Sequence, residues 1–83
     1  MALTAATKDA ITFENGTAQQ RNFDAYRMTK LAEMPPVDVH ILTGDPKMKG
    51  VGEPGLPPFA PALANAIFSL TGKRVRKLPF EWE

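Results

Sequence analysis

The segment spanning residues 60–71 is predicted to be a helix that is apolar on every side. Pro61 suits the first turn of a helix, and Gly72 suits the position just past its end. Asn65 and Ser69 interrupt a run of apolar residues made up of Ala62, Leu63, Ala64, Ala66, Ile67, Phe68 and Leu70. A surface helix carries one apolar stripe, whereas a helix that is apolar all round is normally buried on every side. We therefore expect this chain to be part of something larger, or to associate with another surface.

The chain has 83 residues, which is enough for one small domain. A domain of this size buries only about 60% of the surface that its unfolded chain exposes, so its own core is small. The absence of cysteine excludes disulfides and thiolate ligands, and His40 has no second histidine to join it in a zinc site. The formal net charge of +1 indicates neither a nucleic-acid partner nor a membrane partner. No metal site is predicted from these residues alone.

Residues 1–6 form a short apolar start that lacks both a basic leader and a long apolar run. Neither a signal peptide nor a transmembrane helix is therefore expected there. A chain without cysteine is compatible with the cytoplasm and with the periplasm, so the localisation stays open.

The dipeptide Asn15-Gly16 predicts a β-hairpin over residues 9–23. It lies between two runs with alternating polarity, and a type I′ turn needs a positive φ angle at both central residues. The register that follows pairs Glu14 with Thr17, Phe13 with Ala18 and Ile11 with Gln20.

The rest of the chain completes an α+β fold, in which the hairpin and one or two further strands pack with one C-terminal helix. Residues 37–42 alternate as a strand with its valines and isoleucine on one face, and His40 is interpreted as a surface residue on the other. Residues 43–58 hold four glycines and four prolines, which excludes regular structure. Residues 74–79 are expected to form a last short strand.

The residues Gly50-Val51-Gly52-Glu53-Pro54-Gly55 fit the spacing of the dinucleotide-binding motif G-x-G-x-x-G. That motif requires a helix beginning at the glycines, which Pro54 and the following prolines exclude. The segment instead presents Glu53 on a stiff loop with little side-chain bulk around it, and Pro54 favours an extended conformation at Glu53. From spacing alone, Glu53 is either a solvated acid on a surface turn or a carboxylate that a large ligand can approach.

A longer set of residues resembles the C-terminus of the xanthine dehydrogenase family, in particular the isoquinoline 1-oxidoreductase type of molybdopterin-binding large subunit. The resemblance runs in order through residues 10–16, 20–23, 37–41, 51–55, 57–68 and 71–76, and so covers essentially the whole chain. On this basis the chain is interpreted as a single C-terminal segment, residues 1–83, of a molybdopterin-binding domain.

The resemblance implies a molybdenum hydroxylase that acts on an aldehyde or an N-heterocycle. It gives Glu53 the role of the base beside molybdenum and places Gly50, Val51 and Gly52 alongside the cofactor, molybdopterin cytosine dinucleotide. It also implies the remainder of the large subunit and an iron–sulfur subunit as partners. The chain departs from the family pattern at Lys49, where a glycine is common, and at Arg21, where a serine is usual.

Two interpretations of the whole chain follow. In the first, it is a fragment or a split piece of a molybdenum hydroxylase, inactive and without bound cofactor by itself, and it self-associates when isolated. In the second, it is a free-standing interaction module that retains the fold without the chemistry. A third interpretation, a nucleic-acid patch over residues 73–77 with Phe80 and Trp82 nearby, is less favoured than a solvated strand because the chain has no charge excess.

Overall fold

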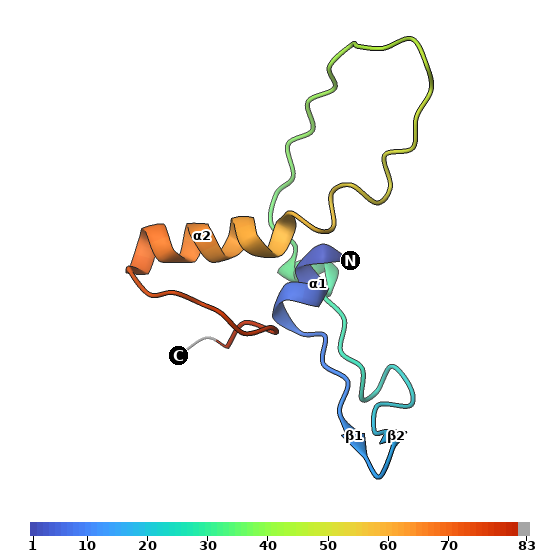
Figure 1. Ribbon diagram of the computed structural model, residues 1–83, viewed down its shortest axis with the longest axis vertical. Coiled ribbons are helices and arrows are strands. Elements are labelled where there is room, and N and C mark those ends of the chain that lie inside the picture. The colour runs from blue at the N-terminus through green and yellow to red at the C-terminus, as the bar shows by residue number, and fades with distance from the viewer. Residues whose placement is uncertain (82–83) are drawn as a thin grey trace.

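A computed structural model describes residues 1–81 of the chain. In chain order it contains helix α1 (Ala2–Thr7), strands β1 (Phe13–Glu14) and β2 (Thr17–Ala18), a 3₁₀ turn η1 (Leu31–Glu33) and helix α2 (Phe59–Thr71). The two strands form one antiparallel hairpin, which lies apart from the helices, while α1 lies beside α2 (Figure 1). The predicted α+β class, with a hairpin and a C-terminal helix, is confirmed.

The hairpin adopts the predicted turn and the predicted register at its tip. Phe13 pairs with Ala18 and Glu14 pairs with Thr17. Asn15 and Gly16 have φ angles of 49° and 75°, so both central residues are left-handed, as a type I′ turn requires. Beyond the tip, the Gln19 N–H still donates to the Thr12 carbonyl at 2.9 Å, but the strands then stop and side-chain bonds replace the predicted pairing of Ile11 with Gln20. The Gln20 Oε1 atom accepts a hydrogen bond from the backbone N–H of Thr12 at 2.8 Å.

Replacing Gly16 with valine is expected to destabilise the hairpin by about 1–3 kcal/mol, because a β-branched residue resists a positive φ angle. The nuclear Overhauser contacts between Phe13 and Ala18 measure the population of the hairpin. Gly44→Val is the matched control, since Gly44 has no positive φ angle and a Cβ atom there meets nothing within 4 Å. Equal Phe13–Ala18 contacts in both variants would show that the turn does not depend on Gly16.

Helix α1 is the centre of the small core, and its residues were not predicted to be helical. Ala6 is only 1% exposed, and Thr4 and Phe80 are also buried. The backbone N–H of Phe80 donates to the carbonyl of Ala6 at 2.8 Å, which ties the end of the chain to its beginning. The backbone N–H of Thr29 donates to Thr4 Oγ1 at 3.2 Å. A six-residue helix is marginal by itself, so these long-range contacts hold it in place.

An ion pair between Lys8 and Glu33 connects the end of α1 to η1. The Lys8 ammonium, and after it the backbone N–H of Lys30, lower the pKa of the Glu33 carboxyl. Because the folded-state pKa is lowered, the stabilisation is present above the ordinary carboxylate pKa and is lost as the pH falls through the lowered value.

Replacing Lys8 with methionine is therefore expected to raise the pKa of Glu33 toward its ordinary value. A pH titration followed by NMR at the Glu33 side chain measures the change. Asp45 is the internal control, because its pKa is lowered by the backbone N–H of Lys47 and by Lys49, neither of which the substitution touches. An unchanged Glu33 pKa in Lys8→Met would contradict the assignment of Lys8 as the main cause.

Helix α2 agrees with the predicted helix over 60–71 within one residue at its beginning. It ends as predicted at Gly72, which has a φ angle of 71° and donates its N–H to the carbonyl of Phe68 at 2.8 Å. None of its residues is buried, and Leu70 is 88% exposed. The expectation that this chain cannot cover an all-round apolar helix therefore agrees with the structure.

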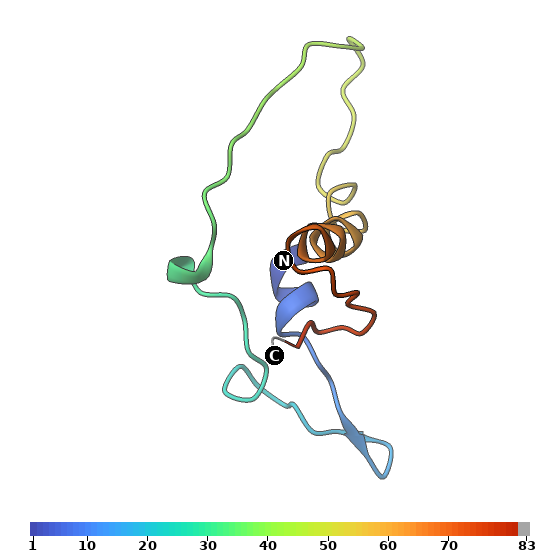
Figure 2. The same cartoon turned by 90° about the vertical axis from the view of Figure 1, so that its left-hand side faces the viewer.

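The molecule exposes far more surface than a compact protein of its mass. Its radius of gyration is 16.3 Å, against about 12 Å for a compact domain of this length. Its accessible surface is 7746 Å², whereas a folded monomer of 9.1 kDa exposes roughly 4,900 Å². An open loop joins η1 to α2, and its two limbs stand apart in both views (Figures 1 and 2). The described chain is therefore extended, and most of its side chains are open to solvent.

Two expected strands are absent from the described residues. Residues 37–42 lie on the rising limb of the open loop, which is the limb that leaves η1, whereas the returning limb leads into α2. Residues 74–79 follow α2, and neither segment is in a strand. A strand needs a neighbouring edge to bond to, and no second edge lies beside either segment within residues 1–81. Residues 43–58 are without a regular helix or strand, as predicted.

Candidate functional site

Glu53 lies in a turn that leads into α2. Its backbone carbonyl accepts a hydrogen bond from the N–H of Leu56 at 3.0 Å, and the carbonyl of Leu56 accepts one from the N–H of Phe59 at 3.4 Å. Phe59 is the first residue of α2, so two successive turns connect the glutamate to the helix. The prolines at 54, 57 and 58 restrict the backbone between them. Glu53 is thereby held on a short, stiff support at the beginning of α2.

The turn encloses an open hollow of about 420 Å³, which is lined by Gly50, Gly52, Glu53, Pro54 and Pro57. Three of the four residues predicted for the site, Gly50, Gly52 and Glu53, thus come together. The fourth, Val51, is 87% exposed and does not line the hollow.

Glycines at this hollow are not required by packing within the chain. A Cβ atom added at Gly50, Gly52 or Gly55 would meet nothing within 4 Å. None of the three has a positive φ angle, so their backbone would accept other residues as well. They leave a surface without side-chain bulk on both sides of Glu53.

The Glu53 carboxylate makes no ion pair and no side-chain hydrogen bond within residues 1–81. Lys49, four residues before Glu53 in the sequence, forms an ion pair with Asp45 instead. Its Nζ atom lies 3.1 Å from an Asp45 carboxylate oxygen. Glu53 is therefore a free acceptor on an exposed loop.

These residues form at most one wall of a cofactor site. Among residues 1–81 no group of three or more metal-ligating side chains comes together. One carboxylate and a glycine-lined surface do not hold a metal cofactor, because such a site needs a full set of contacts with fixed geometry. Within residues 1–81, Glu53 and the glycine-lined surface are therefore not a complete metal site.

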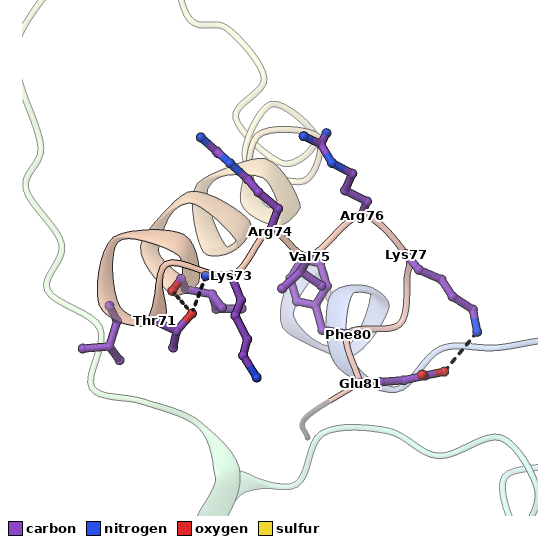
Figure 3. Close-up of a pocket in the computed structure, with 10 residues that line it drawn as sticks. Thr71, Lys73, Arg74, Val75, Arg76, Lys77, Phe80 and Glu81 are labelled. Carbon is purple, nitrogen blue, oxygen red and sulfur yellow. Dashed lines mark hydrogen bonds and ion pairs between the residues drawn. The ribbon is translucent and has the colours of Figure 1, made fainter.

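A second hollow, of about 360 Å³, lies between the end of α2 and the segment that follows it (Figure 3). The Arg74 guanidinium lies 3.5 Å from the centre of the Phe68 ring, and Lys77 pairs with Glu81 at 3.0 Å. Lys73 points away from Arg74 and Arg76 (Figure 3). The four basic residues, Lys73, Arg74, Arg76 and Lys77, all line this hollow. The preference for a solvated strand over a nucleic-acid site stays a prediction, and Trp82 lies outside the described residues.

His40 is exposed on the open loop, in agreement with its interpretation as a surface residue. Within the described part of the chain, no helix has the length and apolar character needed to span a membrane.

Three curated proteins are similar to this chain over most of its length. A membrane-bound aldehyde dehydrogenase (pyrroloquinoline-quinone) of Gluconacetobacter polyoxogenes is 38% identical over 78% of this chain. The isoquinoline 1-oxidoreductase beta subunit of Brevundimonas diminuta is 34% identical over 93% of it. A subunit of the nicotinate dehydrogenase of Pseudomonas putida is 38% identical over 92% of it.

The chain spans a tenth or less of these relatives, with 8%, 10% and 6% of their respective lengths. No family model matches the chain, and no solved structure matches its fold. The predicted resemblance to the isoquinoline 1-oxidoreductase type of large subunit is confirmed by the comparison.

Proposed function

Since this chain belongs with the oxidoreductase subunits of the isoquinoline 1-oxidoreductase type, of which it matches a short segment, we propose that it is the piece of a molybdenum hydroxylase subunit that supplies the catalytic base, Glu53. The reaction class is hydroxylation of an aldehyde or an N-heterocycle. The names of the relatives, which refer to an aldehyde, isoquinoline and nicotinate, support these two substrate classes.

The observation that carries the proposal is the setting of Glu53. A carboxylate that acts as a base must reach the reacting group and must be free to accept its proton. Glu53 is held by two turns at the start of α2, is free of ion pairs, and stands between glycines that let a large cofactor come close. An acid that served only the fold would be expected to bond to a neighbour, as Glu33 does with Lys8.

The cofactor that we propose for the complete subunit is molybdopterin cytosine dinucleotide, with Gly50, Val51 and Gly52 alongside it. The group supplies the two-electron oxidation, and an iron–sulfur subunit takes up the electrons. The name of the Gluconacetobacter relative specifies pyrroloquinoline-quinone instead. We base the choice of molybdenum on the Val51-Gly52-Glu53-Pro54-Gly55 motif. Metal analysis distinguishes it from the quinone.

The isolated chain is not catalytic in this proposal, because its residues form only one wall of the site. We expect elemental analysis of the purified chain to find well under a tenth of a molybdenum atom per chain, since most of the cofactor contacts must come from elsewhere. Near-stoichiometric molybdenum in the purified chain would contradict this expectation.

A composite enzyme tests the proposed cofactor of the complete subunit. In it, the segment of the Brevundimonas diminuta beta subunit that matches this chain is replaced by this chain, and the other subunits are unchanged. The composite enzyme is expected to contain molybdenum and no pyrroloquinoline-quinone. A composite enzyme that folds and binds the quinone in place of molybdenum would overturn the proposed cofactor.

A further inference from the structure

Residues 37–42 have the alternating sequence of a β-strand, but within residues 1–81 they have no pairing partner. Val37, Val39 and Ile41 lie on one side of an alternating segment and are 68%, 74% and 88% exposed. Asp38 and His40 occupy the other side. Branched side chains favour a pleated, half-buried surface, and strict alternation is typical of a strand with one covered face.

The backbone of this segment is unsatisfied within the described chain. None of the N–H or C=O groups of residues 37–42 bonds to another group of residues 1–81. The segment stands on the rising limb of the open loop, well separated from the returning limb in both views (Figures 1 and 2). Both of its edges are therefore free to pair.

The sequence on either side limits where pairing can begin and end. Pro35 and Pro36 have no N–H to donate, and Gly44 and Pro46 follow the apolar residues. The six residues between these breakers span about 20 Å in an extended conformation, which is a common strand length in sheets.

We infer that residues 37–42 add as a strand to an exposed sheet edge in the remainder of the parent subunit, with Val37, Val39 and Ile41 facing an apolar layer. This inference rests on the proposed function, because it takes the partner to be the rest of that same protein. Backbone hydrogen bonds supply the affinity in such strand addition, and pockets for alternate side chains supply the specificity. The role of Glu53 as a base does not by itself require that residues 37–42 dock as a strand.

The size of the exposed surface favours the remainder of the parent protein over a second copy of this chain as the partner of residues 37–42. The molecule exposes roughly 2,800 Å² more than a compact monomer of its mass, whereas a standard interface covers about 800 Å² on each partner. One symmetric contact between two copies would leave most of the excess uncovered. A body about ten times larger, such as the rest of each relative, can cover it from several sides.

Hydrogen exchange tests the inference on the full chain mixed with the Brevundimonas diminuta beta subunit that lacks the matching segment. Association is measured first, by sedimentation, and amide exchange at residues 37–42 second. We expect association together with at least about 100-fold slower exchange at alternate amides, because every second N–H of an added edge strand bonds to its neighbour. Val39→Pro is expected to weaken association at least tenfold, and Met48→Pro, on the fully exposed returning limb, is the matched control.

Each other outcome overturns the inference in a distinguishable way. Association without protection at 37–42 overturns strand addition and leaves the proposed function intact. Concentration-dependent protection at 37–42 in the chain alone assigns the strand to a second copy. No association, together with free exchange at residues 37–42 in the composite enzyme, overturns strand addition. The proposed function fails with it only if that composite enzyme also shows no turnover.

Discussion

Replacement of Glu53 by glutamine in the composite enzyme is expected to lower kcat by about 10²–10⁴-fold, the usual contribution of a positioned general base. The amide keeps the shape of the carboxylate and still forms hydrogen bonds, but it cannot accept the proton. Molybdenum content is expected to stay unchanged, because Glu53 is a single exposed side chain beside a glycine-lined hollow. Stopped-flow or steady-state turnover together with elemental analysis measures both quantities.

Glu14→Gln is the matched control for this substitution, because Glu14 lies on the hairpin and is exposed. It is expected to leave turnover unchanged. In the isolated chain, Glu53→Gln is expected to change the free energy of unfolding by no more than about 0.5 kcal/mol, as is usual for an exposed side chain without partners. A large loss of stability there would make Glu53 a structural anchor and would contradict its role as a base.

Replacement of Leu70 by lysine is expected to weaken self-association of the isolated chain by about ten- to a hundredfold, which corresponds to the roughly 1.5–3 kcal/mol of a buried leucine side chain. We propose that isolated copies associate through the uncovered face of α2, where Leu70 is 88% exposed. Sedimentation equilibrium over a range of concentrations measures the dissociation constant.

Leu42→Lys is the matched control, because Leu42 is 90% exposed on the open loop and away from α2. It is expected to leave self-association unchanged. Equal effects of the two substitutions would show that association is a general property of the exposed apolar surface, and a monomer at high concentration would exclude self-association through α2 altogether.

The parts of the fold that depend on local chemistry could be predicted from the sequence. The hairpin tip follows from the preference of Asn15-Gly16 for positive φ angles, and the end of α2 follows from Gly72. Both features need only a few neighbouring residues, so tertiary contacts do not override them.

The parts that depend on distant contacts could not be predicted. Helix α1 is too short to be stable by itself, and it is held by Thr29 and Phe80, which no local pattern connects to it. Residues 37–42 show the opposite case, since their alternation predicts a strand whose partner is absent from residues 1–81. A strand is a property of two segments, and a sequence pattern describes only one of them.

The candidate site was predicted by resemblance more than by geometry. The spacing of the glycines could not distinguish a solvated acid at Glu53 from a functional carboxylate. The two differ only in whether a ligand from outside this chain lies beside Glu53. The structure brings Gly50, Gly52 and Glu53 to one hollow and leaves Val51 outside it. The role of Glu53 as a base stays a prediction that rests on the matched motif.

Turnover of isoquinoline by the composite enzyme tests whether this chain supplies the catalytic base. The comparison is between the Brevundimonas diminuta beta subunit that carries this chain in its matching segment and the same protein with a glycine–serine linker of equal length there. We expect turnover with this chain, and a loss of at least about 100-fold with the linker or with Glu53→Gln. A composite enzyme that folds and binds molybdenum but turns over no faster than the linker version would show that this chain is an interaction module without catalytic chemistry.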